Sequence, residues 1–186
     1  MSYSIMESPV GPGNKIASFL PYSDFLGSWM SGAKMVDSPP DPIELTWDPD
    51  NEGEIRKAYY EAGVVLMLKD LVAALREAGV DNLDAYPVII RSTRNAEVCS
   101  DYVAVNIIGA IAAADMEKSE IIDEGSGMID VIFGSLVIDE DKAQGKLLFR
   151  LAESVGAVVV HERVVAHLLN KGSFGLTFTD PENYCG

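Results

Sequence analysis

Two histidines in the segment His161–His167 (HERVVAH) are the residues that most directly suggest metal chemistry. A zincin site needs two histidines four residues apart, so that both imidazoles meet on one face of a helix. Here they are six residues apart, which places the rings about 240° apart around a helix. The segment therefore predicts ordinary helix positions rather than a zinc site.

Cys99 is the candidate nucleophile, because a thiol beside His161 or His167 would form the pair that a cysteine hydrolase needs. The surrounding sequence, AEVCSD, matches no nucleophile motif, and the carboxylate of Asp101 would raise the pKa of the thiol. Cys99 and the distant Cys185 also fall short of a disulfide framework, so free thiols in a reducing cytosol are the simpler account. We expect no catalytic residue, no metal and no cofactor.

Carboxylates gather in two clusters late in the chain. The first consists of Asp115, Glu117, Glu120, Asp123 and Glu124, and the second of Asp139, Glu140 and Asp141. A paired-carboxylate hydrolase would need one acid desolvated and another kept charged. The spacing does not match a calcium loop, which alternates oxygen ligands and ends in glutamate. Two interpretations stay open: solvated turns, or an acidic face that binds a basic partner.

The charge balance narrows the class of partner. The chain has 29 acidic and 14 basic side chains, giving a net charge of −15. Such a field repels nucleic acid and anionic lipid, and it attracts basic proteins, although solubility alone is the alternative explanation. The N-terminus has no basic region followed by an apolar run, and the apolar stretch Val103–Ala114 is too short to span a bilayer. We expect a cytoplasmic protein with no nucleic-acid or membrane partner.

The positions of proline and glycine and the spacing of apolar residues predict the elements that would position these residues. The length is close to one domain, so we expect a single domain over residues 1–186. Seven of the nine prolines fall within the first 49 residues, which predicts a loop-rich wrapping segment over residues 1–50 with a short strand at Ile43–Trp47. Residues 51–79 show helical periodicity, with Asn51 as N-cap and Gly79 as the stop. The apolar face shifts at Gly63, which predicts either a kink or two consecutive helices there.

After Gly79 the pattern changes to strands rich in β-branched residues. The predicted strands are Tyr86–Arg91, Tyr102–Ile108, Ile129–Ile138 with a bulge at Gly134, Leu147–Leu151, Ala157–Val160 and Leu176–Phe178. A helix is predicted at His161–Lys171. Helices early and strands late favour an α+β fold, with a mostly antiparallel sheet in the C-terminal half. Arg150 lies within an apolar strand, either on the solvent face or buried against a carboxylate, and we favour a structural role.

Six short strings, taken in order, look like those of a known family. They are YVAVNIIG (Tyr102–Gly109), DMEKSE (Asp115–Glu120), LVIDE (Leu136–Glu140), LFRLAE (Leu148–Glu153), VVHERV (Val159–Val164) and GSFGLTF (Gly172–Phe178). Their order resembles the eleventh immunity-protein family of bacterial polymorphic toxin systems, formerly a domain of unknown function. The resemblance covers residues 86–182, and the first 80 residues match only loosely.

The resemblance implies a role rather than a reaction. The protein would bind and neutralise a cognate toxin and so protect the producing cell and its kin. The family supplies no catalytic residues to carry over. An acidic inhibitor of a basic toxin gains association rate from electrostatic steering, and tight binding needs an aromatic or aliphatic anchor. Candidate anchors, each of which fits better in the core, are Trp29, Trp47, Tyr59, Tyr60 and Tyr86. Two other functions stay open: a hydrolase or toxin-modifying enzyme that uses surface carboxylates, and a self-associating scaffold.

Overall fold

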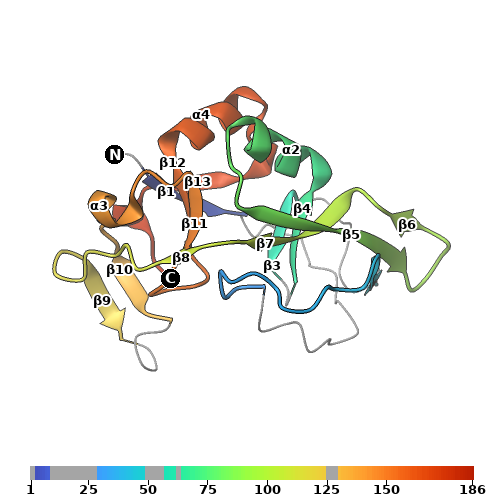
Figure 1. Ribbon diagram of the computed structural model, residues 1–186, viewed down its shortest axis with the longest axis horizontal. Helices are drawn as coiled ribbons and strands as arrows, with labels where there is room; N and C mark the ends of the chain where they lie inside the picture. The colour runs from blue at the N-terminus through green and yellow to red at the C-terminus, as the bar shows by residue number, and fades with distance from the viewer. Residues whose placement is uncertain (1–2, 9–28, 49–56, 62–63, 125–129) are drawn as a thin grey trace.

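Two larger β-sheets and a separate two-stranded hairpin contain the strands of the described residues (Figure 1). The computed structural model describes residues 3–8, 29–48, 57–61, 64–124 and 130–186. One sheet has the order β13-β1-β12-β11-β8, with β1 (Tyr3–Glu7), β8 (Ala110–Ile111), β11 (Leu148–Leu151), β12 (Val158–His161) and β13 (Thr177–Thr179). The other has the order β2-β5-β7-β4-β3, with β6 beside β5; its strands are β2 (Ile43–Trp47), β3 (Tyr59–Glu61), β4 (Val65–Leu68), β5 (Leu83–Ser92), β6 (Val98–Cys99) and β7 (Tyr102–Ile107). The hairpin consists of β9 (Glu120–Asp123) and β10 (Ile132–Ser135).

Most strand pairs are antiparallel, and the described parallel pairs are β2–β5 and β8–β11. The chain passes from one sheet to the other between β7 and β8. Asn82 secures this crossing, since its side-chain amide donates to the carbonyl of Ile108 at 2.6 Å and to that of Leu148 at 2.9 Å. Gly32 lies against the same crossing with φ at +70°, and a Cβ there would stand 2.5 Å from the nitrogen of Ala110. The loop at residue 32 therefore packs against the crossing so closely that only glycine fits there.

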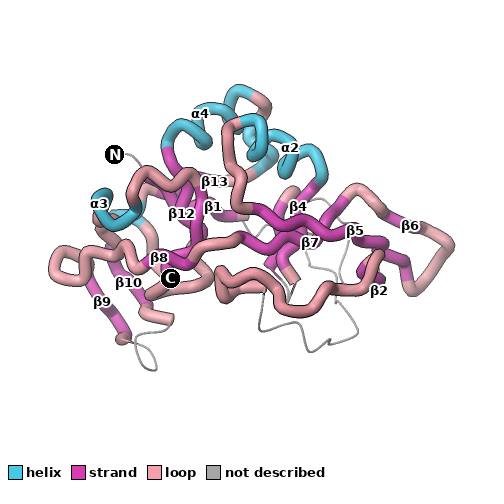
Figure 2. Tube along the Cα trace, viewed as in Figure 1, coloured by secondary structure: helices cyan, strands magenta, loops and turns pink. Residues whose placement is uncertain are grey.

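The helices α2 (Lys69–Glu77) and α4 (Glu162–Asn170) lie together along one edge of the view, and α3 (Glu140–Ala143) lies apart, near the hairpin (Figure 2). Two short 3₁₀ turns, η2 (Ser173–Gly175) and η3 (Pro181–Asn183), flank β13. Helix α2 is terminated by Gly79, two residues after its last residue Glu77, and the φ of Gly79 is +99°. The Val80 N–H donates to the carbonyl of Leu75 at 3.0 Å, and the Gly79 N–H donates to that of Arg76 at 2.9 Å. This pattern is a Schellman cap, so the predicted stop at Gly79 is confirmed.

Two hydrophobic clusters form the interior. The larger one is formed by residues of both larger sheets and of α2 and α4, among them Leu66, Leu71 and Ile107. The smaller one joins the hairpin to the β1–β12 sheet through Phe133, Leu136 and Phe149, all of which are at most 1% exposed. The inner face of the hairpin therefore packs against the rest of the protein, and the outer face points away from it.

The mixed α+β class is confirmed, but the predicted helix over residues 51–79 is wrong at residues 59–61 and 65–68. Tyr59–Glu61 and Val65–Leu68 are strands, and the helix begins only at Lys69. The apolar residues of β4 pair with β7, with Leu66 opposite Ala104 and Met67 opposite Val103, so sheet pairing outweighs local helical periodicity. The predicted N-cap Asn51 and the kink at Gly63 lie outside the described residues.

The other boundary differences are smaller. The strand at Ile43–Trp47 is confirmed, but the N-terminal segment does more than wrap the core, because β1 is an interior strand between β12 and β13. The predicted strand Ile129–Ile138 is shorter, ending at Ser135, and Ile129 lies outside the described residues. The predicted irregularity at Gly134 is confirmed by a register shift between Phe133 and Ser135.

Candidate functional site

The two acidic clusters, separate in sequence, lie side by side in the structure. Strand β9 pairs with β10, with Ile132 opposite Asp123 and Ser135 opposite Glu120. The pairing continues beyond the hairpin, where Asp115 N–H donates to Val137 and Asp139 N–H donates to Ala113, both at 2.8 Å. All eight predicted partner-binding carboxylates therefore belong to one region, residues 113–124 and 130–142, which we call the acidic region.

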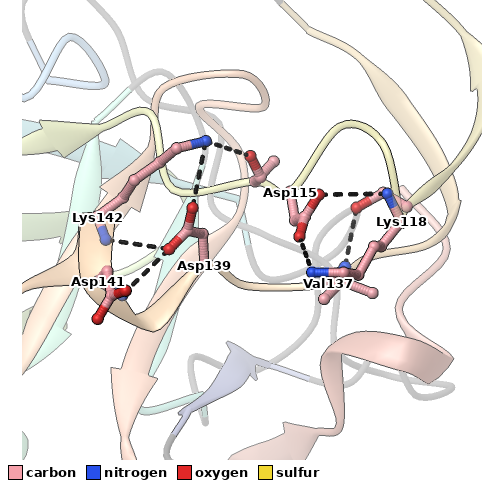
Figure 3. A network of polar contacts seen from close by, with 8 residues as sticks. Asp115, Lys118, Val137, Asp139, Asp141 and Lys142 are labelled. Atoms are coloured by element: carbon pink, nitrogen blue, oxygen red, sulfur yellow. Dashed lines mark hydrogen bonds and ion pairs between the residues drawn. The ribbon is translucent and has the colours of Figure 1, made fainter.

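Two of the eight carboxylates hold the backbone of this region together (Figure 3). Asp115 forms an ion pair with Lys118 at 2.6 Å, and this hydrogen bond lowers the pKa of Asp115 and raises the pKa of Lys118. The Asp115 side chain also accepts from the Lys118 backbone N–H at 3.3 Å, which closes the turn before β9. Asp115 is thus a turn-forming residue whose charge is compensated.

Asp139 has the same kind of role at the start of α3 (Figure 3). Its side chain accepts from the backbone N–H groups of Asp141 at 3.1 Å and Lys142 at 3.2 Å, as an N-cap does. Lys142 forms an ion pair with Asp139 at 3.5 Å and donates to the carbonyl of Ala114 at 3.3 Å. Asp139 therefore begins the single helical turn of α3.

The remaining six carboxylates are exposed: Glu117, Glu120, Asp123, Glu124, Glu140 and Asp141. Residues 113–142 carry nine of the 29 acidic side chains but two of the 14 basic ones, so nearly half of the net charge of −15 arises from a sixth of the sequence. Both of those lysines are paired with the inner aspartates. The acidic region therefore carries a net negative charge, with six of its carboxylates on the surface.

This surface is suited to long-range attraction rather than to acid–base catalysis. A paired-carboxylate mechanism requires one carboxyl group removed from water, whereas these six side chains are solvent-exposed. Exposed charges of one sign on a small area raise the local concentration of oppositely charged partners. The arrangement can therefore guide a basic molecule to this side of the protein.

The histidines and Cys99 have structural surroundings. His161 is the N-cap of α4, its Nδ1 accepting from Arg163 N–H at 3.1 Å, and its ring meets Tyr3 edge-on. His167 lies 3.6 Å from Glu77 of α2. Burial raises the pKa of the Cys99 thiol, which is unfavourable for a nucleophile. Within the described ranges, no group of three or more His, Cys, Asp or Glu side chains is arranged to hold a metal ion.

The sequence predicted only one member, Arg150, of a buried ionic cluster. Arg150 is fully buried, and its guanidinium donates to Glu61 Oε1 at 2.8 Å and to the carbonyl of Val155 at 2.6 Å. The Tyr59 hydroxyl donates to the same carboxylate oxygen, and burial raises the pKa of Tyr59 well above its usual value. Arg150 thus takes the second predicted alternative, burial against a carboxylate. Its partner was missed because residues 59–61 were predicted to be helical.

This ionic cluster connects the two sheets, because Arg150 belongs to β11 and Glu61 to β3. A pocket of about 260 Å³ adjoins it. The pocket is lined by Ile5, Met6, Glu7, Ser8, Lys57, Tyr59, Tyr60, Glu61, Gly156 and Tyr184. Burial lowers the pKa of Lys57 at one side of this pocket. Since Glu61 is held by Arg150 and Tyr59, the cluster is suited to fixing the sheets relative to each other.

The candidate aromatic anchors belong mainly to the core. Trp29, Trp47, Tyr59 and Tyr60 are 1–5% exposed. Tyr86 is half-buried and packs against the edge of Trp29, with ring centroids 5.8 Å apart. The preference for core positions is therefore confirmed for four of the five, and an anchor for a partner must be sought among other side chains.

Fold and site together define a mixed α+β protein with a strongly acidic outer region. The model of the Immunity protein family (Imm11) matches residues 14–183 of the 186, and the chain belongs to that family. No curated protein matches the chain. Membership indicates an immunity role and, in general terms, a toxin as partner. None of the described helices has the length and apolar character that crossing a bilayer requires.

Proposed function

We propose that this protein binds a cognate bacterial toxin and neutralises it by protein–protein interaction, without catalysis. The observation that carries the proposal is the concentration of exposed carboxylates on the acidic region. Toxins that act on nucleic acid carry basic surfaces, because phosphate is bound by Lys and Arg. Family membership supplies the class of partner, and the acidic region supplies the complementary charge.

Electrostatic steering explains why such a surface is useful to an inhibitor. Complementary charge raises association rates to the order of 10⁸–10⁹ M⁻¹s⁻¹ at low salt. The effect falls as ionic strength rises, because the Debye length is about 10 Å at 0.1 M salt. A newly made toxin is therefore captured before it reaches its substrate, and the capture rate depends on salt.

The test uses the toxin encoded by the gene adjacent to that of this chain. The first variant converts the six exposed carboxylates of the acidic region to amides. The control makes the same number of conversions at exposed acids elsewhere, namely Asp37, Asp41, Asp70, Asp81, Glu97 and Glu162. We expect the first variant to lose most of the salt-dependent association rate and the control to retain it. Absence of binding and of protection by the wild-type protein would overturn the proposal.

Stoichiometry separates binding from toxin modification. A binding inhibitor abolishes toxin activity at one equivalent, and the toxin regains activity after it is separated from the inhibitor. An enzyme that modifies the toxin protects at far below one equivalent, and the toxin stays inactive after separation. The second result would refute the non-catalytic part of the proposal while leaving the immunity role intact.

We further infer that the chain acts in the cytoplasm and folds as a single domain. The contact of both sheets through the Arg150–Glu61 pair supports one folding unit. A single cooperative unfolding transition, the same by fluorescence and circular dichroism, is expected. Two separated transitions, or recovery of the protein outside the cytoplasmic fraction, would contradict this inference.

A further inference from the structure

The hairpin β9–β10 has two faces of different character. On the inner face, Phe133 lies opposite Ile121, and Phe133 is fully buried while Ile121 packs against the smaller hydrophobic cluster. On the outer face, Ile132 lies opposite Asp123 and is 44% exposed. Ile122 falls between the paired positions Ile121 and Asp123 of β9 and is 66% exposed. Two isoleucines therefore point to solvent from a hairpin that is already anchored on its other side.

Gly134 allows these side chains to gather on the outer face. A Cβ placed on Gly134 would lie 3.3 Å from Ile122 Cδ1 and 3.2 Å from Glu120 Cδ. The side chains of Ile122 and Glu120 therefore lie over Gly134 of β10, in space that a larger side chain at position 134 would restrict. The outer face then consists of an apolar centre, Ile122 and Ile132, flanked by the carboxylates of Glu120 and Asp123.

We infer that this outer face of the hairpin is the docking surface for a basic face of the toxin, with Ile122 and Ile132 as the apolar anchor. The inference rests on the proposed function and adds the location of the contact. An aliphatic centre surrounded by charged residues is typical of an interface, where the centre supplies affinity and the rim supplies orientation. The carboxylates of Glu120 and Asp123 are placed to pair with Lys or Arg beside the anchor.

The negative charge of the outer face favours a basic protein surface over a second copy of this chain, a membrane or nucleic acid. Two copies of the hairpin face would bring Glu120 and Asp123 against the same carboxylates of the second copy, and like charges across an interface are unfavourable. A membrane surface or nucleic acid would be repelled for the same reason. A protein surface that combines Lys or Arg with an apolar side chain satisfies both features of this face.

The decisive experiment measures binding of the toxin from the adjacent gene to hairpin variants. The double variant Ile122→Ser with Ile132→Ser removes the anchor without changing charge. Its matched control is Leu169→Ser, which removes another exposed aliphatic side chain, 54% exposed on α4. We expect the double variant to weaken binding at least about tenfold, the effect of losing one strong interface contact, and the control to bind as the wild type does.

A second pair of variants tests the flanking charges. Glu120→Gln with Asp123→Asn is expected to slow association several-fold at low salt, and this difference shrinks at high salt. Asp70→Asn with Glu162→Gln, an equal change at exposed positions on α2 and α4, is the control. In addition, toxin binding is expected to slow amide hydrogen exchange in β9, which reports the contact directly without any substitution.

The outcomes are distinguishable. If the wild-type protein does not bind the toxin, both the proposed function and this inference fail. If the wild type binds, while the hairpin variants and both controls bind equally well and β9 exchange is unchanged, the docking surface lies elsewhere and only this inference is overturned. Circular dichroism of each variant shows that a loss of binding is not a loss of fold.

Discussion

Carboxylates occur in two environments in this protein, and the comparison separates stability from recognition. In the interior, Glu61 is contacted by Arg150 and Tyr59, and Glu153 is 8% exposed. On the hairpin, Glu120 and Asp123 stand in solvent. A buried charge without its partner is strongly unfavourable, whereas an exposed charge costs little and acts at a distance. The same side-chain type thus fixes the fold inside and shapes the surface potential outside.

The Arg150–Glu61 pair gives the largest expected effect on the interior side of this comparison. Arg150→Ala leaves Glu61 partly buried without its cation and removes a contact between the two sheets. We expect the free energy of unfolding to fall by about 3–5 kcal/mol, as for other broken buried pairs. Urea denaturation monitored by tryptophan fluorescence measures this.

The matched control is Arg91→Ala, which breaks the surface pair with Glu44, 3.5 Å apart, with side chains 50% and 66% exposed. A surface pair contributes about 0–1 kcal/mol, so little change is expected. Equal destabilisation by the two substitutions would contradict the distinction between interior and surface charges.

Asp139 occupies a position between these extremes, because its side chain caps α3 at the edge of the acidic region. Asp139→Ala removes two backbone hydrogen bonds and the pair with Lys142, and it is expected to cost about 1 kcal/mol. The control is Asp141→Ala, which removes an equal charge from an exposed position of the same turn. Thermal denaturation compares the two variants, and a larger loss at Asp141 would show that charge, rather than capping, stabilises this turn.

Glu153 is a second interior carboxylate, and the pH dependence of stability tests its surroundings. Whereas Arg150→Ala is expected to lower the free energy of unfolding, substitution of Glu153 is expected to raise it at neutral pH, by a smaller amount. Burial raises the pKa of Glu153; the backbone N–H of Ala114 donates to its Oε1 at 3.3 Å, and Lys142 lies nearby. A carboxyl whose folded-state pKa is raised binds its proton more tightly when folded, so its contribution to stability is present at acid pH. That contribution is lost as pH rises from the ordinary glutamate value through the folded-state pKa.

The variant Glu153→Gln keeps the shape of this side chain and removes its ionisation. We expect the variant to match the wild type at acid pH and to be more stable at neutral pH, as measured by thermal unfolding over a pH series. A wild-type protein that gains stability over the variant as pH rises would show that the Glu153 carboxylate is stabilised, not strained, by its surroundings.

The interior and the hairpin also differ in how far the sequence alone predicts them. The late strands were predictable because β-branched runs such as Tyr102–Ile107 have strong local preferences. Residues 59–61 and 65–68 were predicted as helix because their apolar spacing fits a helix, and only the pairing of β3 with β4 and of β4 with β7 decides for strands. The Arg150–Glu61 contact joins residues 89 positions apart, and no local pattern encodes such a distance.

For the acidic region, the sequence supplied the residues but not their arrangement. The clusters at 115–124 and 139–141 were visible as composition, and the irregularity at Gly134 was visible as a glycine in a strand pattern. Their adjacency depends on the register between β9 and β10, including the shifts on either side of Phe133. The exposure of Ile122 follows from that register, since a one-residue slip exchanges the faces of a strand.

The smallest expected effect on stability belongs to the outer face of the hairpin, where recognition is proposed. Ile122→Ser removes a side chain that is 66% exposed, so the free energy of unfolding is expected to change by less than about 0.5 kcal/mol. Phe133→Ala, on the opposite face of the same hairpin, removes a fully buried ring and is expected to cost about 3–5 kcal/mol. Urea denaturation of the two variants gives the contrast. If Ile122→Ser destabilised the protein as much as Phe133→Ala, Ile122 would be a core residue, and weakened toxin binding in that variant would reflect unfolding rather than a lost contact.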